Sequence, residues 1–302
     1  MSSPLPVLLL AGPTAAGKTA AALHVAHGWG ARIVSADAMQ VYRGMDVGTG
    51  KAPPAVLRRF PHACVDVRDP DEPWCAADFA READAAVAGC GPVVVVGGTV
   101  FYLRTFLFGL APTPGSDPEL RAALEAEPDP HAILAATDPV LAARLHPHDR
   151  VRVVRALEVH RLTGRPLSAW HADDRREVRH PHRVLWLDRL DLYARIDARV
   201  ERMMERGYLA EVHRLLESGV APDLKPMRSL GYRHLADHVV HGLALGEAVR
   251  RTKRDTRHFA RKQRAWSRQH ADWIRVDAQD RGAVLAQAEA LWGPPVRRVH
   301  PL

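Results

Sequence analysis

The first hundred residues alternate strand-like apolar runs with glycine loops and helix-like stretches. Residues 6–11 form a continuous apolar run, which breaks into a glycine-containing loop and then into an alanine-rich, helix-like segment. Runs at 32–35 and at 93–96, the latter four consecutive valines, predict two further strands. Apolar strands without polar alternation are typical of parallel sheets covered on both faces. The pattern therefore predicts an α/β fold with a doubly wound parallel sheet.

The sequence pattern changes after residue 112. A proline-rich stretch with helix-start signals precedes an alanine-, leucine- and arginine-rich segment with helical spacing. A further strand is expected at 183–187, followed by helices as far as Trp273. We therefore expect two domains, namely an α/β core with C-terminal helices made of residues 1–114 and 185–302, and a helical insertion subdomain made of residues 115–184.

Composition narrows the class of protein. A chain of 302 residues, 47% hydrophobic and 25% charged, is typical of globular proteins and excludes a disordered or coiled-coil chain. Cys64, Cys75 and Cys90 lack the spacing of a disulfide framework or a zinc site, so we expect a cytoplasmic protein. Residues 85–103 carry no charge, but glycine and proline interrupt them, so we expect no membrane span.

The basic residues are unevenly distributed. The formal net charge is +7, yet residues 1–100 hold eight Lys/Arg against nine Asp/Glu. Residues 250–275 hold ten Lys/Arg against two Asp, and six arginines there recur at helical spacing: Arg250, Arg254, Arg257, Arg261, Arg264 and Arg268. Such a stripe indicates either a nucleic-acid-binding face or a plain solvated helix face.

Residues 12–19, GPTAAGKT, match the phosphate-binding motif GxxxxGK[ST] between a predicted strand and a predicted helix. Its glycines let backbone N–H groups approach an anion, Lys18 neutralises charge, and the Thr19 hydroxyl can bind a magnesium ion. The motif indicates a P-loop NTPase-like core that binds a diphosphate or triphosphate, and it leaves the reaction open. The predicted diphosphate-binding residues are Gly12, Pro13, Thr14, Ala15, Ala16, Gly17, Lys18 and Thr19.

Asp37 directly follows the second predicted strand. Open α/β sheets bind their ligands at the carboxyl ends of the strands, where an Asp can hold magnesium or act as a base. The alternative is an ordinary helix N-cap, since Asp is favoured there.

The segment after Asp37, AMQVYRGMDVGTGK at residues 38–51, resembles the signature of the tRNA dimethylallyltransferase family when it is combined with the phosphate loop. The similarity continues in family order over about residues 6–275, in GGT at 97–99, RVVRALEV at 152–159, RSLGYR at 228–233 and RKQRAWSR at 261–268.

The resemblance implies transfer of a dimethylallyl group from dimethylallyl diphosphate to N6 of the adenosine 3′ to the anticodon in tRNA, with release of diphosphate. It implies that the phosphate loop holds the leaving diphosphate with Mg²⁺ on Thr19, and that Asp37 is the general base. Lys18, Thr19 and Arg199 would stabilise the leaving group. The expected partners are the tRNA anticodon stem-loop and dimethylallyl diphosphate, and we expect a monomer.

The resemblance also implies a set of tRNA-binding residues. These are Asp37, Ala38, Met39, Gln40, Thr99, Val151, Arg152, Arg155, Arg228, Gly231, Tyr232, Arg233, Arg261, Lys262, Gln263, Trp266 and Arg268. Helical spacing places Phe259, Trp266 and Trp273 opposite the arginine stripe, where we interpret them as core anchors. Ala38 and Val151 depart from the Ser and Gln usual in the family, which removes a hydroxyl beside Asp37 and one polar side chain from the expected RNA-binding segment.

Two alternatives share the phosphate loop. A small-molecule or nucleotide kinase would bind ATP and phosphorylate an acceptor. A non-catalytic tRNA-binding protein would bind tRNA in a salt-sensitive manner without turnover. The His-Pro-His pairs at 146–148 and 180–182 favour turns over metal ligands, because each contains proline and lacks companion cysteines.

Overall fold

The computed structural model describes residues 5–89, 91–174 and 177–297. The chain divides into two compact units, an α/β unit of residues 1–107 and 179–302 and a helical unit, Phe108–Val178. The helical unit begins seven residues earlier and ends six residues earlier than the expected 115–184. Its start coincides with the end of α4 (Val100–Phe108), and the strand that follows it already begins at His182.

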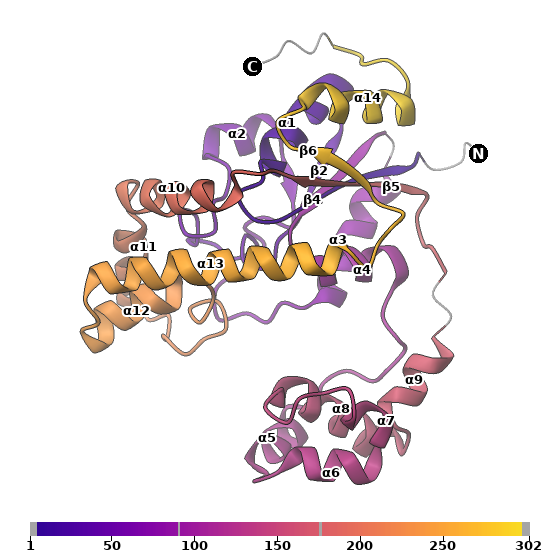
Figure 1. Ribbon diagram of the computed structural model, residues 1–302, viewed down its shortest axis with the longest axis vertical. Coiled ribbons are helices and arrows are strands. Elements are labelled where there is room, and N and C mark those ends of the chain that lie inside the picture. Colours follow the sequence, from indigo (N-terminus) through magenta and orange to yellow (C-terminus); the bar gives the residue numbers. More distant parts are fainter. Residues whose placement is uncertain (1–4, 90, 175–176, 298–302) are drawn as a thin grey trace. The chain divides into compact units, whose positions relative to one another are not determined.

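The α/β unit is built on a six-stranded parallel sheet with the order β3-β2-β4-β1-β5-β6. Figure 1 labels β2, β4, β5 and β6 of this sheet. Its strands are β1 (Val7–Ala11), β2 (Arg32–Ala36), β3 (His62–Ala63), β4 (Val93–Gly97), β5 (His182–Asp188) and β6 (Ile274–Asp277). Every residue of β1 and β4 is buried, as the unbroken apolar runs predicted. The predicted P-loop NTPase-like α/β core is confirmed.

Helices cover both faces of this sheet. On one face, α1 (Lys18–Trp29) and α14 (Arg281–Trp292) pack against Leu8, Val94 and Leu185. On the other face lies α3 (Ala76–Ala88), whose buried Phe79 stacks on Tyr102 of α4. The remaining helices of the unit are α2 (Pro54–Arg59), α10 (Leu192–Glu205), α11 (Tyr208–Glu217), α12 (Tyr232–His241) and α13 (Leu245–Ser267).

The helical unit has a core of its own, formed by Leu124, Leu134, Leu141, Val153 and Leu157 among others. Its helices are α5 (Pro118–Ala126), α6 (Pro130–Thr137), α7 (Pro139–Ala142), α8 (Arg150–Thr163) and α9 (Leu167–Asp173). The first three each begin with an Asp-Pro pair, in which the Asp side chain caps backbone N–H groups and the proline occupies the first turn. This local chemistry is the helix-start signal seen in the sequence.

The structure corrects the expected C-terminal region. The helices end at Ser267, the last residue of α13, rather than at Trp273, and the chain then forms β6 and α14. Cys64 and Cys75 are free thiols, and Cys90 lies outside the described residues. Within the described chain no helix is both long enough and apolar enough to cross a membrane.

Candidate active site

The phosphate loop connects β1 to α1 in a conformation that demands small residues. Gly12 has φ +156°, and a Cβ there would lie 2.3 Å from the carbonyl oxygen of Leu187. Ala15 and Gly17 also have positive φ, and Gly17 caps the N-terminus of α1. The loop therefore presents backbone N–H groups and a helix N-terminus in one place, which suits an anion.

Two cations from distant parts of the chain lie beside this loop. The Lys18 ammonium donates to the Pro13 carbonyl at 2.7 Å. Burial, and then the charge of Arg199, lowers its pKa to about 8 against the opposing effect of Asp37 and Asp188. Arg199 of α10 donates to the Thr49 carbonyl at 3.4 Å, and burial lowers its pKa. Arg199 is thus close enough to disfavour the charged form of Lys18, and an anion bound beside both cations would offset this repulsion.

Asp37 and Thr99 meet at the carboxyl ends of the paired strands β2 and β4. Asp37 Oδ1 accepts hydrogen bonds from the backbone N–H groups of Met39, at 2.9 Å, and Gln40, at 3.4 Å. The Thr99 hydroxyl accepts one from the Ala38 N–H at 3.2 Å. No helix begins at Asp37, so the N-cap alternative is wrong, and Oδ2 accepts no hydrogen bond within the described chain. Asp37 therefore has one oxygen fixed and one available.

Glu211 was missed by the sequence analysis. This buried side chain of α11 accepts hydrogen bonds from the backbone N–H groups of Asp46, Val47 and Gly48 at 2.7–3.0 Å, and from the Tyr232 hydroxyl at 2.6 Å. It fixes the loop that leads to Thr49, the partner of Arg199. Only the spatial approach of α11 to a loop more than 160 residues earlier identifies this role.

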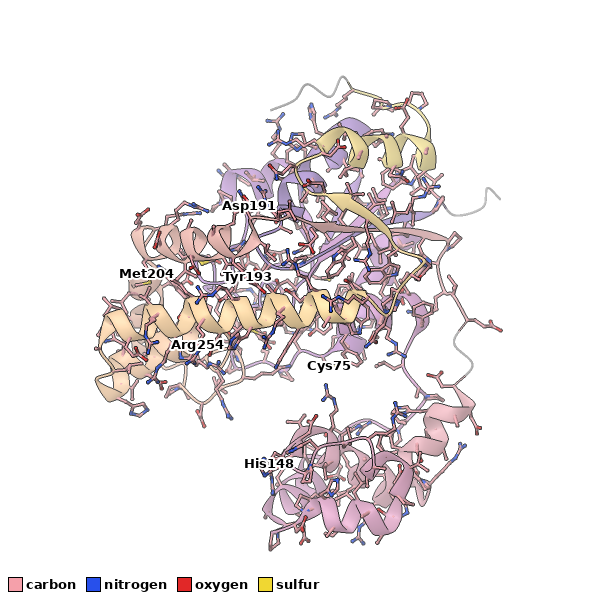
Figure 2. All side chains as sticks on the ribbon, in the orientation of Figure 1. Cys75, His148, Asp191, Tyr193, Met204 and Arg254 are labelled. Carbon is pink, nitrogen blue, oxygen red and sulfur yellow. The ribbon has the colours of Figure 1, made fainter. Side chains whose placement is uncertain are left out.

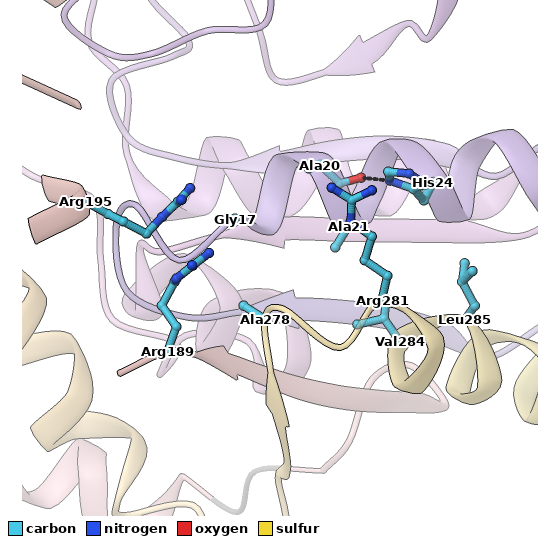
Figure 3. Close-up of a pocket in the computed structure, with 10 residues that line it drawn as sticks. All are labelled: Gly17, Ala20, Ala21, His24, Arg189, Arg195, Ala278, Arg281, Val284 and Leu285. Carbon is cyan, nitrogen blue, oxygen red and sulfur yellow. Dashed lines mark hydrogen bonds between the residues drawn. The ribbon is translucent and has the colours of Figure 1, made fainter. Parts of the chain in front are cut away.

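A cavity of about 160 Å³ lies beside the phosphate loop, between α1 and α14 (Figure 3). It is lined on the α1 side by Gly17 and His24, and three arginines, Arg189, Arg195 and Arg281, also line it. Arg195 donates to the Ala15 carbonyl at 3.2 Å, and Asp191 neutralises Arg189. The positive environment of the loop thus extends beyond Lys18 and Arg199.

The expected tRNA-binding residues divide by exposure. The exposed ones are Val151, Arg152, Arg228, Arg233, Arg261, Lys262 and Arg268, and the half-buried ones are Asp37, Ala38, Met39, Gln40, Thr99, Arg155 and Trp266. Arg152 pairs with Asp149, and Arg233 pairs with Asp255. Arg261, Lys262 and Arg268 have no ion-pair partner among the described residues.

Several of these residues are buried or form hydrogen bonds with other parts of the chain. Gly231 and Tyr232 are buried, and so is Gln263, whose amide bonds the backbone of the phosphate loop. The side-chain amide of Gln40 contacts Ser35 and Thr49. Arg155 holds Glu158 and the carbonyl of Pro114. Gly231, Tyr232 and Gln263 are thus buried in this structure, and their contact with tRNA stays a prediction.

The arginine stripe on α13 is only partly a free surface. Arg254 is exposed (Figure 2) and pairs with Asp255. Arg257 pairs with Asp197 of α10, and Arg264 pairs with Asp188 at the end of β5. These two ion pairs attach α13 to the site and leave Arg261 and Arg268 as the available cations of the stripe.

The three aromatic residues opposite the stripe behave differently. Trp273 is buried, and Trp266 is half-buried against His270 and Trp273. Phe259 is 39% exposed, so the prediction that it anchors the core is wrong. Within the described chain no group of three His, Cys, Asp or Glu side chains could hold a metal ion by itself.

Comparison with known proteins identifies the family of this chain. The family model for IPP transferase matches residues 40–270. A tRNA dimethylallyltransferase of Syntrophobacter fumaroxidans is 44% identical over 297 residues, covering 94% of this chain and 86% of the relative. One of Geobacter sulfurreducens is 43% identical over 289 residues, covering 90% and 92%.

Solved structures agree with this assignment. A tRNA isopentenylpyrophosphate transferase of Staphylococcus epidermidis superposes with a TM-score of 0.68 at 27% identity, covering 94% of this chain and 99% of that one. A eukaryotic dimethylallyltransferase acting on tRNA gives a TM-score of 0.79 at 26% identity, covering 95% and 76%. The chain therefore belongs to the IPP transferase family, the tRNA dimethylallyltransferases, and is a prenyltransferase.

Proposed function

We propose that this chain transfers a dimethylallyl group from dimethylallyl diphosphate to N6 of the adenosine 3′ to the anticodon in tRNA. The observation that carries the proposal is the meeting of Asp37, Lys18 and Arg199 at the carboxyl edge of the sheet, beside the phosphate loop. The allylic C–O bond breaks, a C–N bond forms to N6, the N6 proton passes to Asp37, and diphosphate leaves.

The phosphate loop holds the leaving group. Negative charge develops on the diphosphate as the C–O bond breaks, so fixed backbone N–H groups and the charges of Lys18 and Arg199 lower the barrier. These groups recognise phosphate oxygens rather than a nucleotide base, which is why a loop typical of ATP-binding proteins fits a prenyl diphosphate.

Magnesium fits this site through Thr19. The Thr19 side chain is exposed in the first turn of α1, next to Lys18, and makes no hydrogen bond within the described chain. Because the described chain lacks a cluster of acidic ligands, the ion would take its other ligands from diphosphate oxygens and water. When bound, it would supply further neutralisation of the leaving group.

Asp37 accepts the proton from N6. Its fixed Oδ1 sets the orientation of the carboxylate, and Oδ2 is available to the substrate. Thr99, from the neighbouring strand, places the adenosine. The base must leave its stack to reach Asp37, and this costs less from a single-stranded anticodon loop than from a duplex.

Exposed cations supply tRNA binding. Arg261, Lys262 and Arg268 on α13 neutralise backbone phosphates, and Val151 and Arg152 of the helical unit contact the anticodon stem-loop. We propose that the enzyme acts as a monomer.

The decisive experiment incubates the protein with unmodified tRNA, Mg²⁺ and dimethylallyl diphosphate, and analyses the digested nucleosides by mass spectrometry. We expect prenylated adenosine at the position 3′ to the anticodon, with release of diphosphate and no need for ATP. Transfer of phosphate from ATP to a small acceptor would instead identify a kinase. Salt-sensitive tRNA binding without any product, unchanged by Lys18→Ala, would identify a non-catalytic binder.

A further inference from the structure

Gln263 occupies an unusual position for a polar residue of a basic helix. Its side chain is 5% exposed, although both neighbours, Lys262 and Arg264, carry charge and Lys262 is exposed. Its Oε1 accepts a hydrogen bond from the Thr14 N–H at 3.0 Å, and its Nε2 donates to the Gly98 carbonyl at 2.8 Å. One amide therefore joins two loops that are more than 80 residues apart in the sequence.

These partners also fix the orientation of the amide. An amide has one acceptor end and one donor end. The group that contacts Gln263 is a backbone N–H in Thr14 and a carbonyl in Gly98, so Oε1 faces Thr14 and Nε2 faces Gly98. A carboxylate or an aliphatic side chain of the same length could satisfy at most one of the two contacts.

The two loops are built around this amide. A Cβ on Gly98 would lie 2.4 Å from Gln263 Nε2 and 3.3 Å from the carbonyl oxygen of Gly12, so a side chain at position 98 would displace Gln263 or the phosphate loop. Gly12 begins the phosphate loop, and Gly98 precedes Thr99, whose backbone N–H donates to the Ala36 carbonyl beside Asp37. The contact thus links the diphosphate side of the site to the side that holds the base.

Two ion pairs attach α13, the helix that carries Gln263, to the rest of the α/β unit. Arg264 binds Asp188 through two nitrogens at 2.7–3.1 Å, and Arg257 binds Asp197. The exposed Arg261 lies on the side of α13 opposite Gln263, two residues earlier. α13 therefore has a polar contact to the phosphate loop on one side and exposed cations on the other.

We propose that Gln263 is a positioning residue that sets the distance between the phosphate loop and the Gly98–Thr99 loop. It would thereby align the allylic carbon of the donor with the acceptor amine of the adenosine. The proposal rests on the proposed function. Because reaction requires the two substrates at near-attack separation, a shift of either loop lowers the rate of transfer more than it lowers the binding of either substrate.

The test compares Gln263→Met, which keeps the length of the side chain, with Gln263→Glu, which keeps only the bond to Thr14. Gln269→Met, an exposed glutamine beyond the end of the same helix, is the matched control. We expect both Gln263 variants to lower single-turnover transfer about 10- to 100-fold, since each leaves at least one buried polar group unsatisfied. We expect the Kd for inorganic diphosphate with Mg²⁺ and the Kd for tRNA to change less than about threefold, and the control to match wild type.

Three outcomes would overturn the proposal. These are an unchanged transfer rate in Gln263→Met, a loss confined to the binding of one substrate, and an equal loss in the Gln269→Met control. If Gln263→Met retains its affinity for tRNA, the variant is folded, because the proposed tRNA contacts require a folded α13. Gln263→Glu gives a second, more conservative variant. Failure of the proposed function itself is distinguishable, because wild type would then give no transfer at all.

Discussion

Two regions of the α/β unit differ in how far their polar and charged side chains are buried and whether these side chains have partners within the protein. At the carboxyl edge of the sheet, charged and amide side chains such as Asp37, Glu211 and Gln263 have hydrogen-bond partners and are buried or half-buried. On the exposed side of α13, Arg261, Lys262 and Arg268 face solvent without ion-pair partners in the described chain. The edge of the sheet is fixed by contacts within the protein, whereas the α13 face is exposed to solvent and is the surface that we propose for tRNA.

The difference reflects what each region has to recognise. A reacting carbon, a leaving group and an amine must be held at fixed distances, and only groups oriented by their own hydrogen bonds can do this. A polyanion backbone requires charge at roughly the right place, and flexible exposed cations supply it. Substitutions in the first region should therefore change rates steeply, and those in the second should change affinity gradually.

Asp37→Asn gives the steepest expected loss. The amide keeps the size of the side chain but cannot accept the N6 proton, so the rate of single-turnover transfer should fall about 10²- to 10⁴-fold. The affinity for tRNA, measured by filter binding, should stay within about twofold of wild type. An unchanged rate would remove the base role from Asp37.

Glu211→Ala tests whether the contacts behind the site stabilise the fold. It leaves three backbone N–H groups and the Tyr232 hydroxyl without their acceptor in a buried position. We expect the free energy of unfolding to fall by about 3 kcal/mol, measured by urea denaturation. Glu217→Ala, at an exposed position of the same helix, should cost less than about 0.5 kcal/mol.

The pH dependence of diphosphate binding tests the role of Lys18. Burial lowers the pKa of Lys18 to about 8, so in the free enzyme the ammonium is charged below that pH and loses its proton above it. Because an anion binds the charged form, affinity for inorganic diphosphate should be full below pH 8 and should fall up to tenfold per pH unit above it. Calorimetric titrations at pH 7 and pH 9 would show the decline, and Lys18→Arg should abolish it.

Arg261→Ala gives the smallest expected effect. It removes one exposed cation, so tRNA affinity should fall about threefold at physiological salt, and the slope of log K against log salt should decrease by about 1. The transfer rate at saturating tRNA should not change. A full salt slope in the variant would mean that this side of α13 does not face the RNA backbone.

Local sequence was sufficient for those features that depend on neighbouring residues. The apolar runs determined β1 and β4, the GPTAAGKT motif determined the phosphate loop, and the Asp-Pro pairs determined where α5 to α7 begin. The position of Asp37 directly after a strand was enough to place it at the edge of the sheet, because parallel strands all end there.

Only the tertiary structure decided which polar residues face inward. The family resemblance assigned Gln263 to the tRNA-binding residues and helical spacing assigned Phe259 to the core, whereas the structure buries Gln263 and exposes Phe259. The roles of Glu211, Tyr232 and Gln263 depend on contacts with segments far away in the chain, and periodicity within one helix carries no information about them. The sequence by itself determined the central strands, the phosphate loop and the chemistry they carry, and long-range packing decided which side chains face the site and which hold the loops in place.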